Sequence, residues 1–314
     1  ATTMAILSSL TGYLFKALGF LLGLTLFVAP PPGRATIAPV DKDSLRLQFS
    51  VISDVHTQSL LLPQLRGFAK ALRDMGGAQA PQDALVLLGD NTNNGLAVQY
   101  LAFYGVLSHY NKAGRTLAAM GNHDVSSSIY TTAQTTAMHS FFYQAYTGAY
   151  AGEEAGPAKP WHWERINGYD LIILGDELPE PYTAAVITQA QLDWLEERLD
   201  AAQEGKPVFV FLHQRLNHVG EWGAIGDPSQ ALQDLFESHG NVFVFNGHMH
   251  DSLEEVNVTQ AGGVTYVNTP SLLQQLPRGV GWQVEAYDGQ VALRARNFIQ
   301  GEWLEDYDYR LELE

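Results

Sequence analysis

The chain has 314 residues, of which 46% are hydrophobic and 17% are charged, a composition typical of one globular domain with a substantial core. Its 34 acidic and 18 basic residues give a formal net charge of −16, which disfavours binding to duplex nucleic acid and attraction to anionic lipid. Cysteine is absent, so any metal site must use His, Asp, Glu or Asn.

The first 35 residues differ from the rest of the chain. Residues 5–29 are almost entirely apolar, and the Pro-rich stretch 30–33 ends the run. About 20 apolar residues span a bilayer, so residues 5–29 are long enough for a membrane anchor. A signal peptide or a buried core helix fits the same pattern. We treat residues 1–35 as a hydrophobic N-terminal segment with a Pro-rich linker, and residues 36–314 as the main domain.

Lys16 is the only charged residue of this apolar run, and it precedes the most apolar half. Either membrane interpretation therefore places the main domain outside the cytoplasm, as an anchored or a secreted protein. The spacings Ser8-x-x-x-Gly12 and Gly19-x-x-x-Gly23 would let two such helices pack closely.

Strands and helices alternate over the next part of the chain. The apolar spacing predicts strands over 45–52, 84–88 and 115–120, with helices over 61–75 and 98–112 between them. Each strand closes on a polar cluster, at Asp54-x-His56, at Gly89-Asp90 and at residues 121–124 (GNHD). This alternation implies a parallel or mixed sheet with helices outside it, in which ligands bind beyond the carboxyl ends of the strands.

Residues 125–168 are less regular. We expect a helical piece near 132–146 and otherwise a loop that shapes substrate choice. Regular elements then resume, with predicted strands over 169–175, 208–212 and 242–245 and predicted helices over 189–202 and 229–238. His213 follows one of these strands and Gly247-His248-Met249-His250 follows another. Residues 252–314 indicate a run of strands with hairpin turns, one of them at Asp288-Gly289.

Side-chain alternation gives an expectation for the paired ligands. Strand side chains alternate with period two, so Asp54 and His56 should lie on the same side of a pleated chain. His248 and His250 should share a side for the same reason. Asn122 offers a neutral carbonyl oxygen, which limits the negative charge of a site built from these residues.

Five strand ends in this order resemble the calcineurin-like metallophosphoesterase family, whose pattern is D-x-H, G-D-x-x-x-x-G, G-N-H-D/E, a lone His and G-H-x-H. Residues 89–95 read GDNTNNG and match the second element in full. The resemblance covers roughly residues 46–275. It implies an α/β fold, a four-layer α-β-β-α sandwich of two mixed sheets flanked by helices, with the metal site at the carboxyl edge of the strands.

The resemblance also implies two divalent transition-metal ions, for which Mn, Fe, Zn, Co and Ni all suit nitrogen and oxygen ligands. One ion would take Asp54, His56 and His250, the second would take Asn122, His213 and His248, and Asp90 would bridge both. Purple acid phosphatases, a neighbouring branch, carry Tyr three residues after the G-D aspartate. This chain has Asn93 there, so an iron–tyrosinate centre is not supported.

These features imply a binuclear metal-dependent phosphoester hydrolase of small-molecule substrates, in which a metal-bound hydroxide attacks phosphorus in line. His123 is the expected general acid for the leaving alkoxide, and Asp124 the residue that orients its imidazole. Phosphomonoesters, phosphodiesters including cyclic nucleotides, and pyrophosphates all fit the motifs. The alternative is a catalytically silent phosphoesterase-like module that serves as a binding or scaffold protein.

Several residues beside the motifs could contact substrate. They are polar or aromatic residues at predicted loops, namely Asn93, Asn94, Trp161, His162, Trp163, Arg215 and His218. Turn formation and packing account for such residues at least as well, so none of them is assigned a role from the sequence.

Overall fold

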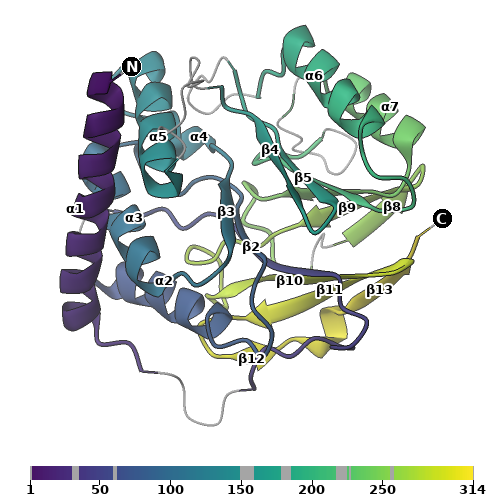
Figure 1. Ribbon diagram of the computed structural model, residues 1–314, viewed down its shortest axis with the longest axis horizontal. Helices are drawn as coiled ribbons and strands as arrows, with labels where there is room; N and C mark the ends of the chain where they lie inside the picture. The colour runs from purple at the N-terminus through teal and green to yellow at the C-terminus, as the bar shows by residue number, and fades with distance from the viewer. Residues whose placement is uncertain are drawn as a thin grey trace.

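Two mixed β-sheets pack face to face in the computed structural model (Figure 1), which describes residues 2–29, 35–58, 62–148, 159–177, 185–216, 225, 228–254 and 258–313. The first sheet runs in the order β12 (Glu302–Trp303), β11 (Gln290–Asn297), β10 (Val280–Tyr287), β1 (Leu47–Ile52), β2 (Ala84–Leu87) and β3 (Arg115–Ala118), with β13 (Tyr309–Glu312) paired to β11. The second runs in the order β4 (His162–Ile166), β5 (Tyr169–Ile173), β6 (Val208–Phe211), β7 (Val242–Asn246), β9 (Val264–Asn268) and β8 (Val258–Ala261).

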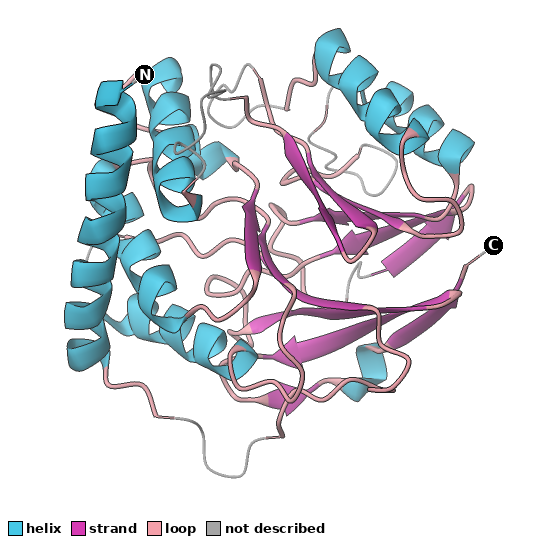
Figure 2. Ribbon diagram, in the orientation of Figure 1, coloured by secondary structure: helices cyan, strands magenta, loops and turns pink. Residues whose placement is uncertain are grey.

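Helices cover the outer faces of both sheets (Figure 2). The first sheet is covered by α2 (Leu62–Met75), α3 (Ala97–Tyr110) and α5 (Thr132–Thr147), on which α1 (Thr2–Leu26) packs, and the second sheet by α6 (Gln189–Asp200) and α7 (Pro228–His239). A short helix, α4 (Asn122–Val125), follows β3, and a 3₁₀ turn, η3 (Glu305–Tyr307), precedes β13. The predicted four-layer α-β-β-α sandwich is confirmed.

The core between the sheets is aromatic. Phe49 of β1 meets Phe209, Phe211 and Phe245 of the second sheet edge-on, with ring centroids 5.0, 5.9 and 6.4 Å away. Strands β1, β2 and β3 are parallel and so are β5, β6 and β7. Central strands that are buried on both faces require continuous apolar runs such as residues 208–211, VFVF. This packing brings the carboxyl ends of both parallel sets to one edge of the molecule.

Two predicted local features have different outcomes. The hairpin at Asp288-Gly289 is confirmed, because Tyr287 pairs with Gln290 across a two-residue turn and Gly289 has φ +78°. The loop predicted over 125–168 is wrong at 162–166, where β4 pairs antiparallel with β5. Residues 162–166 form an edge strand whose side chains are half-exposed. They therefore lack the continuous apolar run that predicted the other strands.

Helix α3 is apolar on all sides, which is typical of a helix buried on all sides. Its inner side packs towards the first sheet, and α1 covers its outer side. A side chain at Gly19 of α1 would overlap the carbonyl oxygen of Gly105, so glycine lets the two helices approach closely. Among the described residues, Thr3–Leu26 alone form a helix long and apolar enough to cross a membrane, judged by length and a mean hydropathy of 1.6.

A buried ion pair joins three distant parts of the chain. The Arg296 guanidinium on β11 donates to both carboxylate oxygens of Asp74 on α2, at 2.6 and 3.0 Å. It also donates to the carbonyl oxygen of Ala35, at 2.6 Å. Arg296 and Asp74 are at most 1% exposed, so each needs the other as a compensating charge.

We expect Arg296→Ala to lower the free energy of unfolding by about 3–5 kcal/mol, because it leaves the Asp74 carboxylate buried without its partner. The matched control is the double variant Arg296→Met, Asp74→Leu, which removes both charges and should recover most of that loss. Urea unfolding followed by circular dichroism measures both. A loss below about 1 kcal/mol for Arg296→Ala would contradict the stabilising role of this pair.

Candidate metal centre

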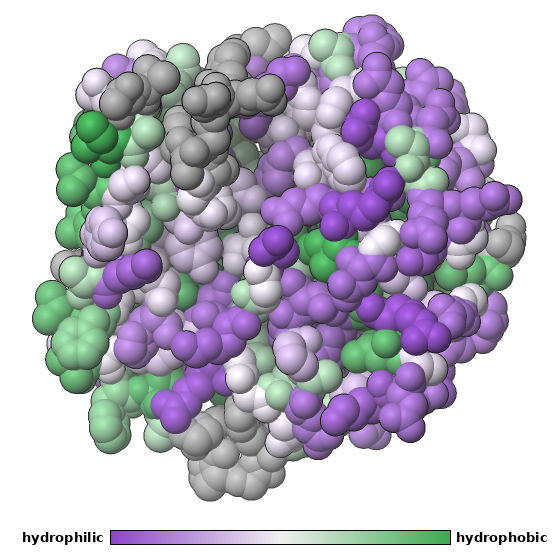
Figure 3. All heavy atoms as spheres, in the orientation of Figure 1, coloured by the Kyte–Doolittle hydropathy of each residue, from purple (hydrophilic) through white to green (hydrophobic). Residues whose placement is uncertain are grey.

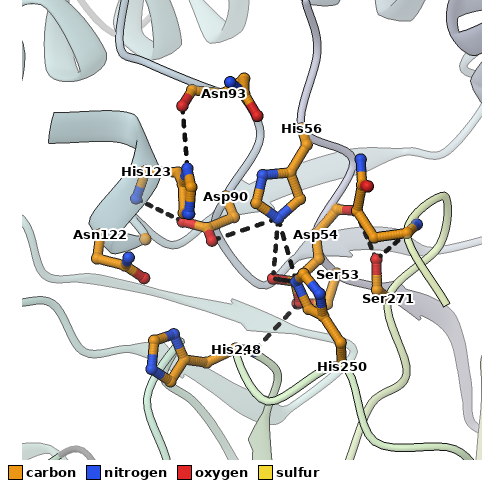
Figure 4. A network of polar contacts seen from close by, with 12 residues as sticks. Ser53, Asp54, His56, Asp90, Asn93, Asn122, His123, His248, His250 and Ser271 are labelled. Carbon is orange, nitrogen blue, oxygen red and sulfur yellow. Dashed lines mark hydrogen bonds and ion pairs between the residues drawn. The ribbon is translucent and has the colours of Figure 1, made fainter. Parts of the chain in front are cut away.

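The seven predicted ligands lie together at the carboxyl edge where the two sheets meet, and Figure 4 labels all of them except His213. The first sheet contributes Asp54 and His56 after β1, Asp90 after β2 and Asn122 at the start of α4 after β3. The second sheet contributes His213 after β6 and, after β7, His248 and His250. Residues from widely separated parts of the sequence thus converge because both sheets end here.

The backbone that carries these side chains is not extended. Positive φ angles between +49° and +71° occur at Asp54, His56, Asp90, His248 and His250. The prediction that alternation along a strand aligns the paired ligands is therefore wrong, since β1 ends at Ile52 and β7 at Asn246. Left-handed conformations are uncommon in residues other than glycine, and they cluster at functional sites where the surrounding structure fixes them.

The first cluster consists of Asp54, His56, Asp90 and His250, whose ligand atoms all lie within 4.8 Å of one another. The Nε2 atom of His250 lies 3.0 Å from Asp54 Oδ1 and 3.2 Å from the Nε2 atom of His56. Two imidazole nitrogens that face each other at this distance need a proton or a cation between them. The donor set and its geometry therefore fit a divalent metal ion.

The second cluster consists of Asp90, His213 and His248, with ligand atoms again within 4.8 Å of one another. Asn122 joins it, because its Oδ1 lies 3.2 Å from His213 Nε2. His213 Nδ1 lies 2.8 Å from the carbonyl oxygen of Leu88. A carbonyl can only accept, so Nδ1 carries a hydrogen, which leaves Nε2 to face Asp90 and Asn122.

The Asp90 carboxylate stands between the two clusters. Its Oδ2 lies 3.5 Å from His56 Nε2 and 3.3 Å from His213 Nε2. Its Oδ1 accepts a hydrogen bond of 2.8 Å from the backbone N–H of His123. One oxygen is thus held by the backbone, while the other faces a histidine from each cluster.

The two carboxylate oxygens of Asp54 likewise have different partners. Its Oδ2 accepts hydrogen bonds from the Ser53 hydroxyl and from the backbone N–H of His248, the latter at 3.1 Å, and Oδ1 faces His250. Ser271 donates to the backbone carbonyl of Asp54 at 3.0 Å. Ser53 and Ser271 were not found from the sequence, because serines that support a ligand have no spacing of their own.

The ionisable groups of the site shift one another's pKa values. Burial opposes ionisation of Asp54, yet hydrogen bonds with His250 and His56 hold its pKa well below the usual value. Burial alone would lower the pKa of His213, but the charge and hydrogen bond of Asp90 raise it to about 9. Burial and the charge of His213 lower the pKa of His248 to about 4. Two buried carboxylates thus draw positive charge to this point, and metal ions would supply it while displacing protons.

Three of the ligands follow a glycine because there is no room for a side chain at Gly89, Gly121 or Gly247. A Cβ at Gly121 would overlap the carboxylate of Asp90. A Cβ at Gly89 would lie 2.8 Å from His213 Nδ1, and Gly89 also has φ +94°. The G-D and G-N spellings of the motifs therefore have a steric reason.

His123 borders the first cluster, with its ring edge-on to that of His56 at a centroid distance of 4.6 Å. Its Nδ1 lies 3.0 Å from the carbonyl oxygen of Asn93, so Nδ1 donates and Nε2 is directed elsewhere. Asn93 therefore orients the imidazole, a role for which Asp124 was predicted. Nothing in the sequence marks this contact, because any residue type supplies a backbone carbonyl.

Asp124 instead connects the two polar turns. It is fully buried, and its carboxylate accepts hydrogen bonds from the backbone N–H of Gly121 at 3.0 Å and of Thr92 at 2.9 Å. The Thr92 hydroxyl, at 2.9 Å, and the Asn91 backbone N–H, at 3.3 Å, also donate to it. These bonds fix the turn that carries Asp90 against the turn that carries Asn122.

The other residues that could contact substrate mostly have partners within the fold. Arg215 pairs with Asp251 at 2.9 Å, and Trp163 lies against the guanidinium groups of Arg165 and Arg198. His162 Nε2 lies 3.0 Å from the Tyr143 hydroxyl, and burial lowers the pKa of His162 to about 3. His218 lies outside the described residues.

Comparison with known proteins agrees with this geometry. The family profile described as calcineurin-like phosphoesterase matches residues 47–252, a range that contains all seven clustered ligands and His123. The chain belongs to the calcineurin-like phosphoesterase family. A search of curated proteins gives no match to the sequence.

Solved structures share the fold at low sequence identity. Purple acid phosphatase PPD1 from yellow lupin (Lupinus luteus) seeds is 14% identical with a TM-score of 0.57, over 85% of this chain and 53% of that one. This chain thus spans about half the length of the lupin enzyme. GAP50, the anchor in the inner membrane complex of Plasmodium, is 11% identical with a TM-score of 0.53, over 86% of this chain and 90% of that one.

We expect Asp124→Asn to lower the free energy of unfolding by about 2 kcal/mol, because buried N–H and O–H donors lose a charged acceptor. Asp43→Asn, at an exposed carboxylate, is the matched control and should unfold like the unsubstituted chain. Urea unfolding measures both. If Asp124→Asn keeps full stability and instead loses turnover mainly on poor leaving groups, Asp124 acts on His123 and its assignment as the link between the two turns is wrong.

Proposed function

We propose that this chain is a binuclear metal-dependent phosphoester hydrolase of small-molecule substrates. The observation that carries the proposal is the pair of His and Asp clusters that share Asp90, with its Oδ2 facing His56 and His213. One ion would be held by Asp54, His56, Asp90 and His250, and the second by Asp90, Asn122, His213 and His248. Donors of this kind, without sulfur, suit Mn, Fe, Zn, Co or Ni.

The charge of such a centre is what this protein needs to attract a phosphate. Two divalent ions opposite Asp54 and Asp90 leave a local charge of about +2. The chain as a whole carries −16, which repels anionic substrates elsewhere on its surface. When bound, the ions supply an activated water for attack on phosphorus and hold the phosphoryl oxygens.

His123 is the proposed general acid. Its Nδ1 hydrogen is committed to the Asn93 carbonyl, so Nε2 is the atom that would hold a proton for the departing alkoxide. The His123 ring lies beside His56, and His123 directly follows Asn122 in the sequence. It therefore borders both clusters, and neither cluster needs it as a ligand. A donor at this place neutralises the negative charge that develops on the leaving oxygen.

We expect His123→Ala to retain both metal ions and to lower kcat by about 10²- to 10⁴-fold, most of all for substrates with poor leaving groups. Asn93→Ala is the matched control, because it keeps the backbone carbonyl that orients the ring. Elemental analysis measures the metal content, and a series of aryl phosphoesters measures the leaving-group dependence. Unchanged turnover in His123→Ala would remove the assignment.

The substrate is proposed as a phosphodiester or a phosphomonoester. Hydrolysis of a chromogenic bis-ester and a chromogenic mono-ester in the presence of Mn²⁺, with EDTA as the control, tests both classes. We expect turnover that EDTA abolishes and added metal restores. The apolar residues 5–29 support an extracytoplasmic location, membrane-anchored or secreted, for this chemistry.

A second candidate function is a binding or scaffold module that has lost catalysis. The similarity to GAP50, which is an anchor in a membrane complex, favours keeping this alternative. The presence of both clusters and of His123 favours the hydrolase. Metal binding without turnover on any mono-, di- or pyrophosphate ester would favour the scaffold.

A further inference from the structure

Charge is divided very unevenly along the chain. Residues 1–148 contain 9 of the 18 basic residues but 7 of the 34 acidic ones. Residues 149–314 contain the other 9 basic residues and 27 acidic ones. The second part of the chain therefore carries −18 (9 basic and 27 acidic residues) and the first part +2 (9 basic and 7 acidic residues), so the net charge of −16 does not describe the helices that cover the first sheet.

These helices carry almost no negative charge. Among α1, α2, α3 and α5, the only carboxylate is Asp74, which is buried and paired with Arg296. Basic residues are present and exposed, among them Lys16 on α1 and Arg66 on α2. Arg66 donates a hydrogen bond of 3.1 Å to the carbonyl oxygen of Leu26, so its charge lies at the carboxyl end of α1.

The outward side of α1 is apolar along its whole length. Large side chains that are more than half exposed recur there, namely Ile6, Leu10, Tyr13, Phe20 and Leu24, and Phe27 follows the helix. We call these six residues the outer face of α1. Figure 3 shows hydrophobic atoms gathered on the side of the molecule where α1 lies, whereas the side of α6 and α7 is mostly hydrophilic.

The outer face is wider than the contact of two paired helices. With the exposed Ala17 between Tyr13 and Phe20, its residues follow the alternating spacing of three and four that also suits a coiled coil. Leu7, Leu14 and Leu21 are also exposed and widen it, so that at about 100° per residue the apolar arc of the helix covers about 140°. A second copy of α1 would leave much of this arc in water, whereas a lipid surface covers all of it.

The opposite side of α1 is already occupied. Phe15, Leu22 and Leu26 are at most 5% exposed, and Gly19 and Gly23 pack against α3. If α1 left the domain to cross a bilayer, the apolar outer side of α3 would lose its cover. The small residues that were predicted to let two helices pack closely instead let α1 pack against α3 of the same chain. Helix α1 can therefore contact lipid with its outer face while it stays packed on the domain.

We propose that α1 docks the domain on an anionic phospholipid bilayer, with the helix axis along the membrane surface. The outer face enters the apolar part of the interface, and Lys16 and Arg66 at its border contact anionic headgroups. Lys16 can reach the headgroups because a lysine stem can lie along apolar surface while its charged end extends beyond it. This docking is independent of the phosphoesterase chemistry.

Flotation of the full chain with vesicles tests the docking. We expect it to float with vesicles of phosphatidylcholine and phosphatidylserine, and less with phosphatidylcholine alone or at high salt. The triple variant Leu10→Glu, Phe20→Glu, Leu24→Glu should lose at least tenfold in vesicle affinity. Ile129→Glu, Leu276→Glu is the matched control, because both side chains are at least 70% exposed and lie in loops outside α1. Circular dichroism and thermal unfolding confirm that each variant is folded.

Lys16→Glu, Arg66→Glu should remove the preference for phosphatidylserine and leave the weaker binding to phosphatidylcholine. Vesicle binding that is unaffected by the triple variant would overturn the proposal, and so would equal binding to both vesicle types. Resistance of bound protein to alkaline carbonate extraction would show a spanning helix instead. A soluble dimer that the triple variant dissociates, without flotation, would show that a second copy occupies the face. None of these readouts depends on phosphoester turnover.

Discussion

The site depends on two carboxylates that are buried at one point. Asp54 and Asp90 are at most 1% exposed, and a buried charge is stable only when it is paired or hydrogen-bonded. Their partners are backbone N–H groups and imidazoles that arrive from both sheets. Each carboxylate uses one oxygen to hold the fold together and keeps the other for the clusters. The aromatic core around Phe49 therefore has a direct consequence for chemistry, since it holds the two sets of strand ends against each other.

The apolar pattern predicted a parallel or mixed sheet whose strands end in polar clusters, and such clusters must meet at one edge. The four-layer sandwich and the choice of seven ligands came from the resemblance to the phosphoesterase family. The reason for the alignment of Asp54 with His56 could not be predicted. Alternation along a strand was assumed, but left-handed turns place these residues, and no residue type marks such turns reliably. The Asn93 carbonyl was missed because a backbone group has no signal in the sequence. Strand β4 was missed because half-exposed edge strands lack an apolar run.

The two sides of the molecule differ in chemistry. The helices over the first sheet are nearly free of carboxylates and expose the apolar outer face of α1, whereas most acidic residues lie in the second half of the chain. Net charge alone therefore predicts too little about partners, because it averages over surfaces of opposite character. We infer that the acidic part keeps the protein soluble, that α1 attaches it to lipid, and that the metal centre between the sheets supplies the local positive charge that a phosphoester requires.

The strand ends should form one centre for two metal ions with Asp90 between them. Anomalous diffraction from crystals of the protein grown with Mn²⁺ tests this most directly. We predict two anomalous peaks about 3.5–4 Å apart, one on each side of Asp90 Oδ2, with Asp54, His56 and His250 around the first and Asn122, His213 and His248 around the second. A single peak, or two peaks that do not share Asp90, would contradict a centre of this kind.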